Sequence, residues 1–265
     1  MIRIGALIVF LAAAAAAAGP LVTPHDPAGQ ELSRRLEGPS LAHPFGLDEL
    51  GRDILARIMA GARISLLVGI SVVSVSSTAG MLFGSLAGYF GGRIDDAISR
   101  VMDVLMAFPG ILLAIALVAV LGPSLGNVIL ALSVIGWVGY ARLVRAQALR
   151  TREFEFVQAA RALGASPARI VARHVLPSAL PAVVVQATLG MAGAIIAEAA
   201  LSFLGLGVQP PTPSWGTMLD AGRSHLFDAP HLTIFPGLAI ALLVLGFNFL
   251  GDGLRDRVDP KTTSV

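Results

Sequence analysis

Long runs of apolar residues alternate with short polar stretches along the whole chain. About 20 helical residues span a bilayer core of about 30 Å, so charge-free runs of that length predict transmembrane helices. The runs are continuous and rich in Ala, Leu, Val and Gly, which favours helices over the alternating strands of a membrane barrel. Six helices are predicted, with a turn at residues 122–127 between the third and the fourth: 4–22, 64–90, 104–121, 128–145, 181–204 and 232–250.

The first apolar run has a second interpretation. Arg3, the apolar stretch and an Ala-rich end before Gly19-Pro20 also describe a secretory signal peptide. Charge does not decide between the two interpretations, because removal of this segment leaves the other five helices oriented as before.

Composition agrees with a polytopic membrane protein. The chain has 265 residues, of which 55% are hydrophobic and only 14% are charged, and its mean hydropathy is +0.78. A soluble domain has about 25% charged residues, so an ordinary cytosolic enzyme and a disordered tail are both excluded. The net charge of +2 gives no indication of nucleic-acid binding, and the absence of Cys excludes disulfides and thiolate chemistry.

Basic residues predict the orientation in the membrane. With the N-terminus inside, 13 of the 19 basic residues fall in inner segments, Lys261 among them, and 6 fall in outer segments. By the positive-inside rule, both termini are expected in the cytoplasm.

The longest inner loop, residues 143–177, has apolar residues at mostly helical spacing. Gly164 fits a helix stop, and Ser166-Pro167 fits the cap and first position of a new helix. Two short helices joined by a sharp bend are therefore predicted. They fit two roles equally well: amphipathic helices on the membrane surface, or an element that docks in a groove of a cytoplasmic partner.

Two helices carry residues spaced four apart. On the second helix these are small residues, which predict close packing against another helix: Ser76, Gly80, Gly84 and Gly88. On the fifth they are Gln186, Gly190, Ala194 and Glu198. An unpaired carboxylate at membrane depth costs on the order of 2–3 kcal/mol. Glu198 therefore either reaches the outer interface or faces a translocation pathway, for which Gln186 and Gly190 are further candidates.

Several kinds of chemistry find no support in the sequence. His225 and His231 lie near Asp220 and Asp228 but match no ligand spacing, so no metal site is predicted. No HExxH, GxSxG or Walker motif is present, and no catalytic residue or cofactor is predicted. If the chain pumps, its energy comes from a gradient or from another subunit.

The stretch FVQAARALGASPARIVARHVLP resembles the EAA loop of ABC-importer permeases. The residues at matching positions are Gln158, Ala159, Ala160, Gly164, Leu176 and Pro177; Gln158 replaces the usual Glu, and His174 an Ile. Three further stretches resemble the dipeptide/oligopeptide (nickel) permease family, and its C-type subunit in particular: HPFGLDELGRDILARIMAGARISLLVG, AEAALSFLGLGVQPPTPSWGTML and FNFLGDGLRDRVDP.

The resemblance implies an all-α, six-helix type I permease of the bacterial inner membrane, with an uncleaved first helix. Residues 1–62 would form the N-terminal helix and a periplasmic segment, and residues 63–265 a five-helix core with the coupling loop at 143–177. The chain would pair with a second, different permease subunit, two ATP-binding subunits and an external solute-binding protein. It would be a transport subunit without enzyme activity, while the ATPases hydrolyse ATP.

The resemblance also implies di- or oligopeptides as the solute, with nickel, glutathione or another small solute as alternatives. A stand-alone secondary transporter that uses Glu198 and His174 is a rival interpretation. It predicts inverted repeats, which the sequence does not show.

Overall fold

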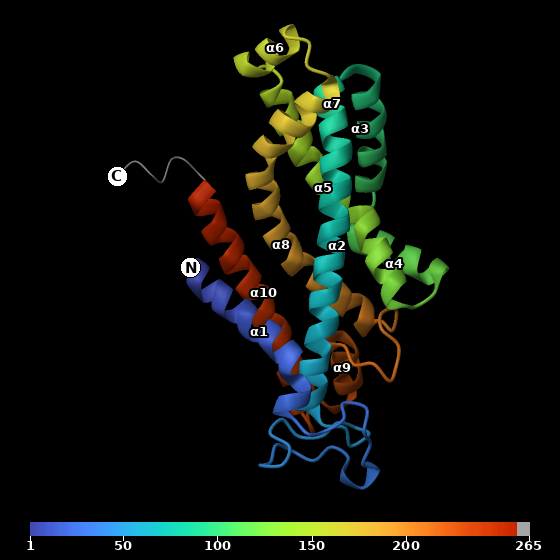
Figure 1. The fold of residues 1–265 in the computed structure, drawn as a ribbon. Helices are drawn as coiled ribbons and strands as arrows, with labels where there is room; N and C mark the ends of the chain where they lie inside the picture. The colour runs from blue at the N-terminus through green and yellow to red at the C-terminus, as the bar shows by residue number, and fades with distance from the viewer. Residues whose placement is uncertain (259–265) are drawn as a thin grey trace.

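The computed structural model describes residues 1–258, which fold into a helical bundle (Figure 1). Regular structure in these residues is helical apart from an isolated bridge between Leu47 and Asp53. The long helices are α1 (Ile2–Val22), α2 (Ile54–Phe90), α5 (Leu125–Thr151), α8 (Leu176–Phe203) and α10 (His231–Val258). The short ones are α3 (Gly92–Met106), α4 (Gly110–Leu121), α6 (Glu155–Ala162), α7 (Pro167–Ile170) and α9 (Trp215–Gly222). Lys261 lies outside the described residues.

Within the described residues, five helices are long and apolar enough to cross a membrane, or six if the bent pair of α3 and α4 counts as one span. The prediction of a single straight helix over 104–121 is wrong. Residues 107–109 break it, and the two parts meet at 86°. Pro109 explains the break, because proline lacks the N–H that a helix needs and disfavours helical geometry in the preceding Phe108.

Helix α2 begins ten residues before its predicted start at residue 64. Asp53 caps it, since its Oδ1 accepts a hydrogen bond of 2.7 Å from the Ala56 N–H. Arg57 does not end the helix, because it is buried and its Nε lies 3.4 Å from Asp48 Oδ2. The proposed division of the chain at residues 62 and 63 therefore falls inside α2.

Other helices also extend past their predicted ends. α5 continues to Thr151 instead of 145, and α10 to Val258 instead of 250. Both predictions stopped near the first charged residues, but a helix can continue in water beyond the bilayer core. Arg142 and Arg145 have partners on α3, 2.8 Å from Asp103 Oδ1 and 2.7 Å from Asp95 Oδ2.

The predicted stripe of small residues on α2 packs against α5. Ser76, Gly80, Gly84 and Gly88 are all buried. A Cβ atom at Gly88 would lie 2.6 Å from the Cβ of Ala148, and one at Gly84 would collide with the Ala141 carbonyl. Close approach of the two backbones therefore requires these glycines, as in other membrane helix pairs.

Helices α1 and α10 pair along their lengths. Gly5 lies against Gly246 and Leu250, and a Cβ at Gly253 would lie 2.5 Å from the Cβ of Ile2. α1 is thus a packed member of the bundle. Both described chain ends point away from the 23–53 segment, which lies with α9 at the opposite end of the bundle from α6 (Figure 1).

Candidate translocation and coupling site

Residues 155–175 form a sharp helical bend, the elbow, at the far end of α5 and α8. α6 ends just before Gly164, whose φ of 82° lies in the left-handed region that favours glycine. The Ala165 N–H donates to the Ala160 carbonyl at 3.0 Å, which closes the helix end. Ser166 then caps α7, accepting from the Arg169 N–H at 3.4 Å, with Pro167 at the first helical position. The predicted stop, cap and proline are confirmed.

The second half of the elbow differs from the prediction of a separate short helix. α7 continues through a π-helical turn, Val171–Val175, directly into α8. The Leu176 N–H donates to the Val171 carbonyl, five residues back, so the wider turn precedes Pro177. The fifth predicted helix, 181–204, begins too late for this reason, and Pro181 lies inside α8.

The elbow is anchored by its own apolar core. Val157, Ile170 and Val175 are fully buried against Tyr89 at the end of α2 and Ala148 of α5. The Arg161 guanidinium lies over the Tyr89 ring, 5.6 Å from its centroid. The elbow is therefore packed on α2 and α5 and is continuous with α8.

The residues that match the EAA pattern lie on the elbow's surface or at its junctions. Gln158, Ala159, Gly164 and Pro177 are exposed, and Ala160 and Leu176 are half-buried. Gln158 Nε2 donates to the Glu153 carbonyl at 3.1 Å, a bond that glutamate could not make. A groove of about 850 Å³ passes between Tyr89 and Phe90 of α2 and Gln158 and Arg161 of α6.

A cavity of about 290 Å³ lies between α2, α4, α5 and α8. Gln186 and Gly190, two of the three predicted pathway residues, line it, and Tyr140 lies against both of them. Its lining has no charged side chain among the described residues: Val72, Val73, Ser76, Gly110, Ile111, Leu132, Ile135, Gly136, Tyr140, Gln186, Gly190, Gly193, Ala194 and Ala197.

Glu198, the third candidate, is fully buried and does not line this cavity. Ser202 Oγ donates to its Oε1 at 2.7 Å, while Oε2 has no hydrogen-bond partner among the described residues. It reaches neither the cavity nor the surface in this conformation.

The remaining histidines, those outside the elbow, lie at the α9 end of the bundle. His225 pairs with Asp228 at 2.9 Å, whereas His231 is buried and contacts the Leu47 carbonyl. Sequence spacing did not connect His25, His43 and Asp53, which the fold of the 23–53 segment brings together. Only the proximity of His43 and Asp53 along the chain could have hinted at this cluster.

Comparisons with known proteins place the bundle in a family. A family model described as "Binding-protein-dependent transport system inner membrane component" matches residues 80–264. The dipeptide transport system permease protein DppC of Alkalihalophilus pseudofirmus is 50% identical over 245 residues, 92% of this chain and 81% of that protein. The glutathione transport system permease protein GsiD of Shigella dysenteriae is 48% identical over 262 residues, 98% and 86% of the two chains.

The fold itself matches a solved transporter. The inward-facing MetNI methionine ABC transporter superposes with a TM-score of 0.61 at 22% identity, covering 76% of this chain and 96% of that one. The four sequence motifs, the elbow and the extent of these matches agree. The chain therefore belongs to the inner-membrane components of binding-protein-dependent transport systems and is a permease component of an ABC importer, of the C type in the dipeptide/oligopeptide permease family.

Proposed function

We propose that this chain forms one half of the translocation pathway of a peptide importer, as one of two different permease subunits. Its family implies ATPase and binding-protein partners. In this proposal both termini and the elbow face the cytoplasm, and the 23–53 segment and α9 face outward. The excess of arginine at the elbow end supports this orientation.

A second permease subunit would cover the surface around α4. This helix has only 12 residues, about 18 Å, which is too short to cross a bilayer alone. Ile111, Leu112 and Val120 expose apolar side chains on it. A partner helix bundle at this face would also complete the wall of the neighbouring cavity.

The elbow is proposed to dock in a cleft of an ATPase subunit. Exposed apolar side chains on and next to the elbow, namely Phe154, Phe156 and Leu163, give a partner apolar surface to bury. Closure of the ATPase dimer on ATP would then push the elbow toward or away from the membrane.

The single observation that carries this mechanism is the unbroken helix from Pro167 through Gly190. At about 1.5 Å per residue, the docked end lies roughly 30 Å from the cavity, on the same rigid element. A push on α7 therefore tilts the wall of the cavity, and the pathway alternates between its two openings.

Small peptides are the proposed solute. The relatives at 48–50% identity are named for dipeptides and for glutathione, which is itself a short peptide. The uncharged, small-residue lining offers no ion-pair partner to a peptide terminus, so selection of the solute would rest with the external binding protein. Residues Gln186 and Gly190 would contact the passing solute.

Reconstitution tests the proposal. Proteoliposomes that contain this chain, a sister permease, two ATPases and a dipeptide-loaded binding protein should accumulate dipeptide only with ATP on the elbow side. Glutathione presented in the same way distinguishes the two solutes. Accumulation by the chain alone would contradict the proposal.

A further inference from the structure

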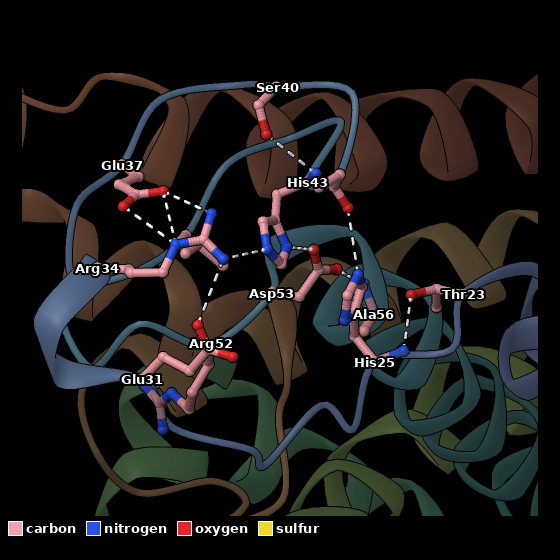
Figure 2. Close-up of polar contacts among 12 residues, drawn as sticks. Thr23, His25, Glu31, Arg34, Glu37, Ser40, His43, Arg52, Asp53 and Ala56 are labelled. Atoms are coloured by element: carbon pink, nitrogen blue, oxygen red, sulfur yellow. Dashed lines mark hydrogen bonds and ion pairs between the residues drawn. The ribbon is translucent and has the colours of Figure 1, made fainter.

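Three potential metal ligands meet inside the 23–53 segment (Figure 2). His25, His43 and Asp53 each offer one ligand atom, and all three atoms lie within 4.8 Å of one another. His43 and Asp53 are buried, and His25 is half-buried. They come from three places: the loop after α1, the middle of the segment, and the cap of α2.

The hydrogen bonds of the two histidines show which ring nitrogen each would offer to an ion. His25 Nε2 lies 3.1 Å from the Ala42 carbonyl, which can only accept, so Nε2 carries the proton and Nδ1 keeps its lone pair. His43 Nδ1 lies 2.8 Å from Asp53 Oδ2. Two atoms that each bind Zn²⁺ at about 2.0–2.1 Å in a tetrahedral site lie roughly 3.3 Å apart, about half an ångström further than in this hydrogen bond. The His43 and Asp53 side chains therefore need little movement to share a cation.

The fold also provides space for the ion. A polar cavity of about 160 Å³ is lined by all three side chains. Asp26 and Glu31 line the same cavity and supply further carboxylate oxygens. A cavity of this size holds an ion and the water molecules that complete its coordination.

The donor set selects the kind of ion. Two imidazoles and a carboxylate suit borderline transition metals such as Zn²⁺, whereas Mg²⁺ prefers an all-oxygen shell. We propose that His25, His43 and Asp53 form a binding site for one divalent transition-metal ion, with Zn²⁺ as the best match. The ion would tie the chain after α1 to the start of α2.

Arg34 competes with the ion and gives the site a distinctive signature. Its Nη1 lies 3.1 Å from His43 Nε2, and its guanidinium is also held by Glu37 at 2.7 Å and Glu31 at 3.3 Å (Figure 2). When an ion binds His43 Nδ1, the ring proton moves to Nε2, which then faces the guanidinium as a second donor. Arg34 must turn away toward its two carboxylates, so its charge opposes binding.

Zinc binding to the full chain in detergent tests the proposal without reference to transport. Calorimetric titration should show one high-affinity Zn²⁺ ion per chain, and Zn²⁺ should raise the melting temperature of the chain. Mg²⁺ should neither bind nor change the melting temperature. His25→Gln keeps the donor to Ala42 but removes the free Nδ1, so it should weaken Zn²⁺ binding at least tenfold. An unchanged melting temperature of this variant without zinc would show that the fold is intact.

Two further variants sharpen the test. His225→Gln alters the other histidine–carboxylate pair of the outer loops, His225–Asp228, and should bind Zn²⁺ like the original chain. Arg34→Gln removes the competing charge and should bind several-fold more tightly. Absence of binding to the original chain, equal binding to His25→Gln, or weaker binding to Arg34→Gln would each overturn the site.

Discussion

The two polar ends of the bundle are held together in opposite ways. The elbow is fixed by apolar packing on α2 and α5, and it leaves Phe156 and Leu163 52% and 89% exposed. The 23–53 segment is fixed by buried ion pairs, with Asp48 beside two arginines and His43 beside Asp53. The elbow exposes apolar side chains, which suits it to docking. The 23–53 segment pairs its charges internally, which suits it to keeping its shape.

The comparison predicts that loss of the buried ion pairs of the 23–53 segment lowers the amount of folded protein. Asp48 accepts from the Leu50 and Arg52 N–H groups, both at 2.9 Å, and its Oδ2 lies 2.7 Å from Arg52 Nε and 3.4 Å from Arg57 Nε. Asp48→Asn removes the carboxylate that contacts both buried guanidiniums. A loss of about 3–5 kcal/mol in the free energy of unfolding is expected.

The measurement for Asp48→Asn is the amount of folded, monodisperse chain recovered from membranes, together with its melting temperature. Asp26→Asn is the matched control, since Asp26 is an exposed carboxylate of the same segment and Asn can still accept from the Ala28 N–H. Equal recovery of Asp48→Asn and Asp26→Asn would show that the buried pairs do not hold this end.

Damage to the elbow should instead remove transport and spare the fold. Gly164 has a φ of 82°, and a Cβ at this position would meet no atom within 4 Å, so backbone geometry alone selects glycine. In Gly164→Val the branched side chain disfavours this geometry, the bend opens, and ATP-driven uptake should fall more than tenfold at normal membrane abundance.

Gly164→Asn tests whether the left-handed backbone conformation at this position, and not glycine itself, is what uptake requires. Asparagine tolerates the left-handed region, so this variant should retain much of the uptake. Normal uptake by Gly164→Val would mean that the elbow does not couple ATP to the pathway, and the contrast between the two ends would fail.

The surface of the elbow offers a finer test. Leu163→Asp places a charge where docking would bury an apolar group, so co-purification of the ATPase should weaken about tenfold, or about 1.4 kcal/mol. The melting temperature of the chain should not change, because Leu163 is 89% exposed. Leu41→Asp changes an equally exposed leucine of the 23–53 segment. It should leave ATPase binding intact, and an equal effect of the two variants would argue against docking at the elbow.

Local signals in the sequence predicted more of the elbow than of the 23–53 segment. Gly164, Ser166 and Pro167 act on their own neighbours, and the bend could be placed to the residue. Long apolar runs likewise predicted the long helices. Pro109 was a local signal too, but the apolar run around it concealed the break between α3 and α4.

Contacts between distant residues account for the remaining differences. Burial of Arg57 in α2 depends on Asp48 and on the Pro27 carbonyl, 30 residues away, so charge alone suggested a later helix start. His25, His43 and Asp53 converge only because the loop between them folds back. Whether Glu198 faces the cavity depended on helix rotation, which a four-residue spacing does not fix.

The smallest expected effect concerns an exposed ion pair of the 23–53 segment. Arg34 donates two hydrogen bonds to Glu37 Oε2, at 2.7 and 3.0 Å, and this holds the pKa of Glu37 below its usual value of about 4.5.

A carboxyl with a lowered pKa in the folded state stabilises the fold at pH values above its unfolded pKa, and this contribution is lost as the pH falls through the folded value. Because the pair is exposed, the contribution is small and sensitive to salt. Glu37→Gln should therefore melt slightly below the original chain by the same margin at pH 7 and pH 6, and the margin should shrink as the pH falls through the folded pKa of Glu37. If the difference in melting temperature instead grows as the pH falls, Arg34 is held mainly by His43 and Glu31. The 23–53 segment would then depend less on Glu37 than the distances of this ion pair indicate.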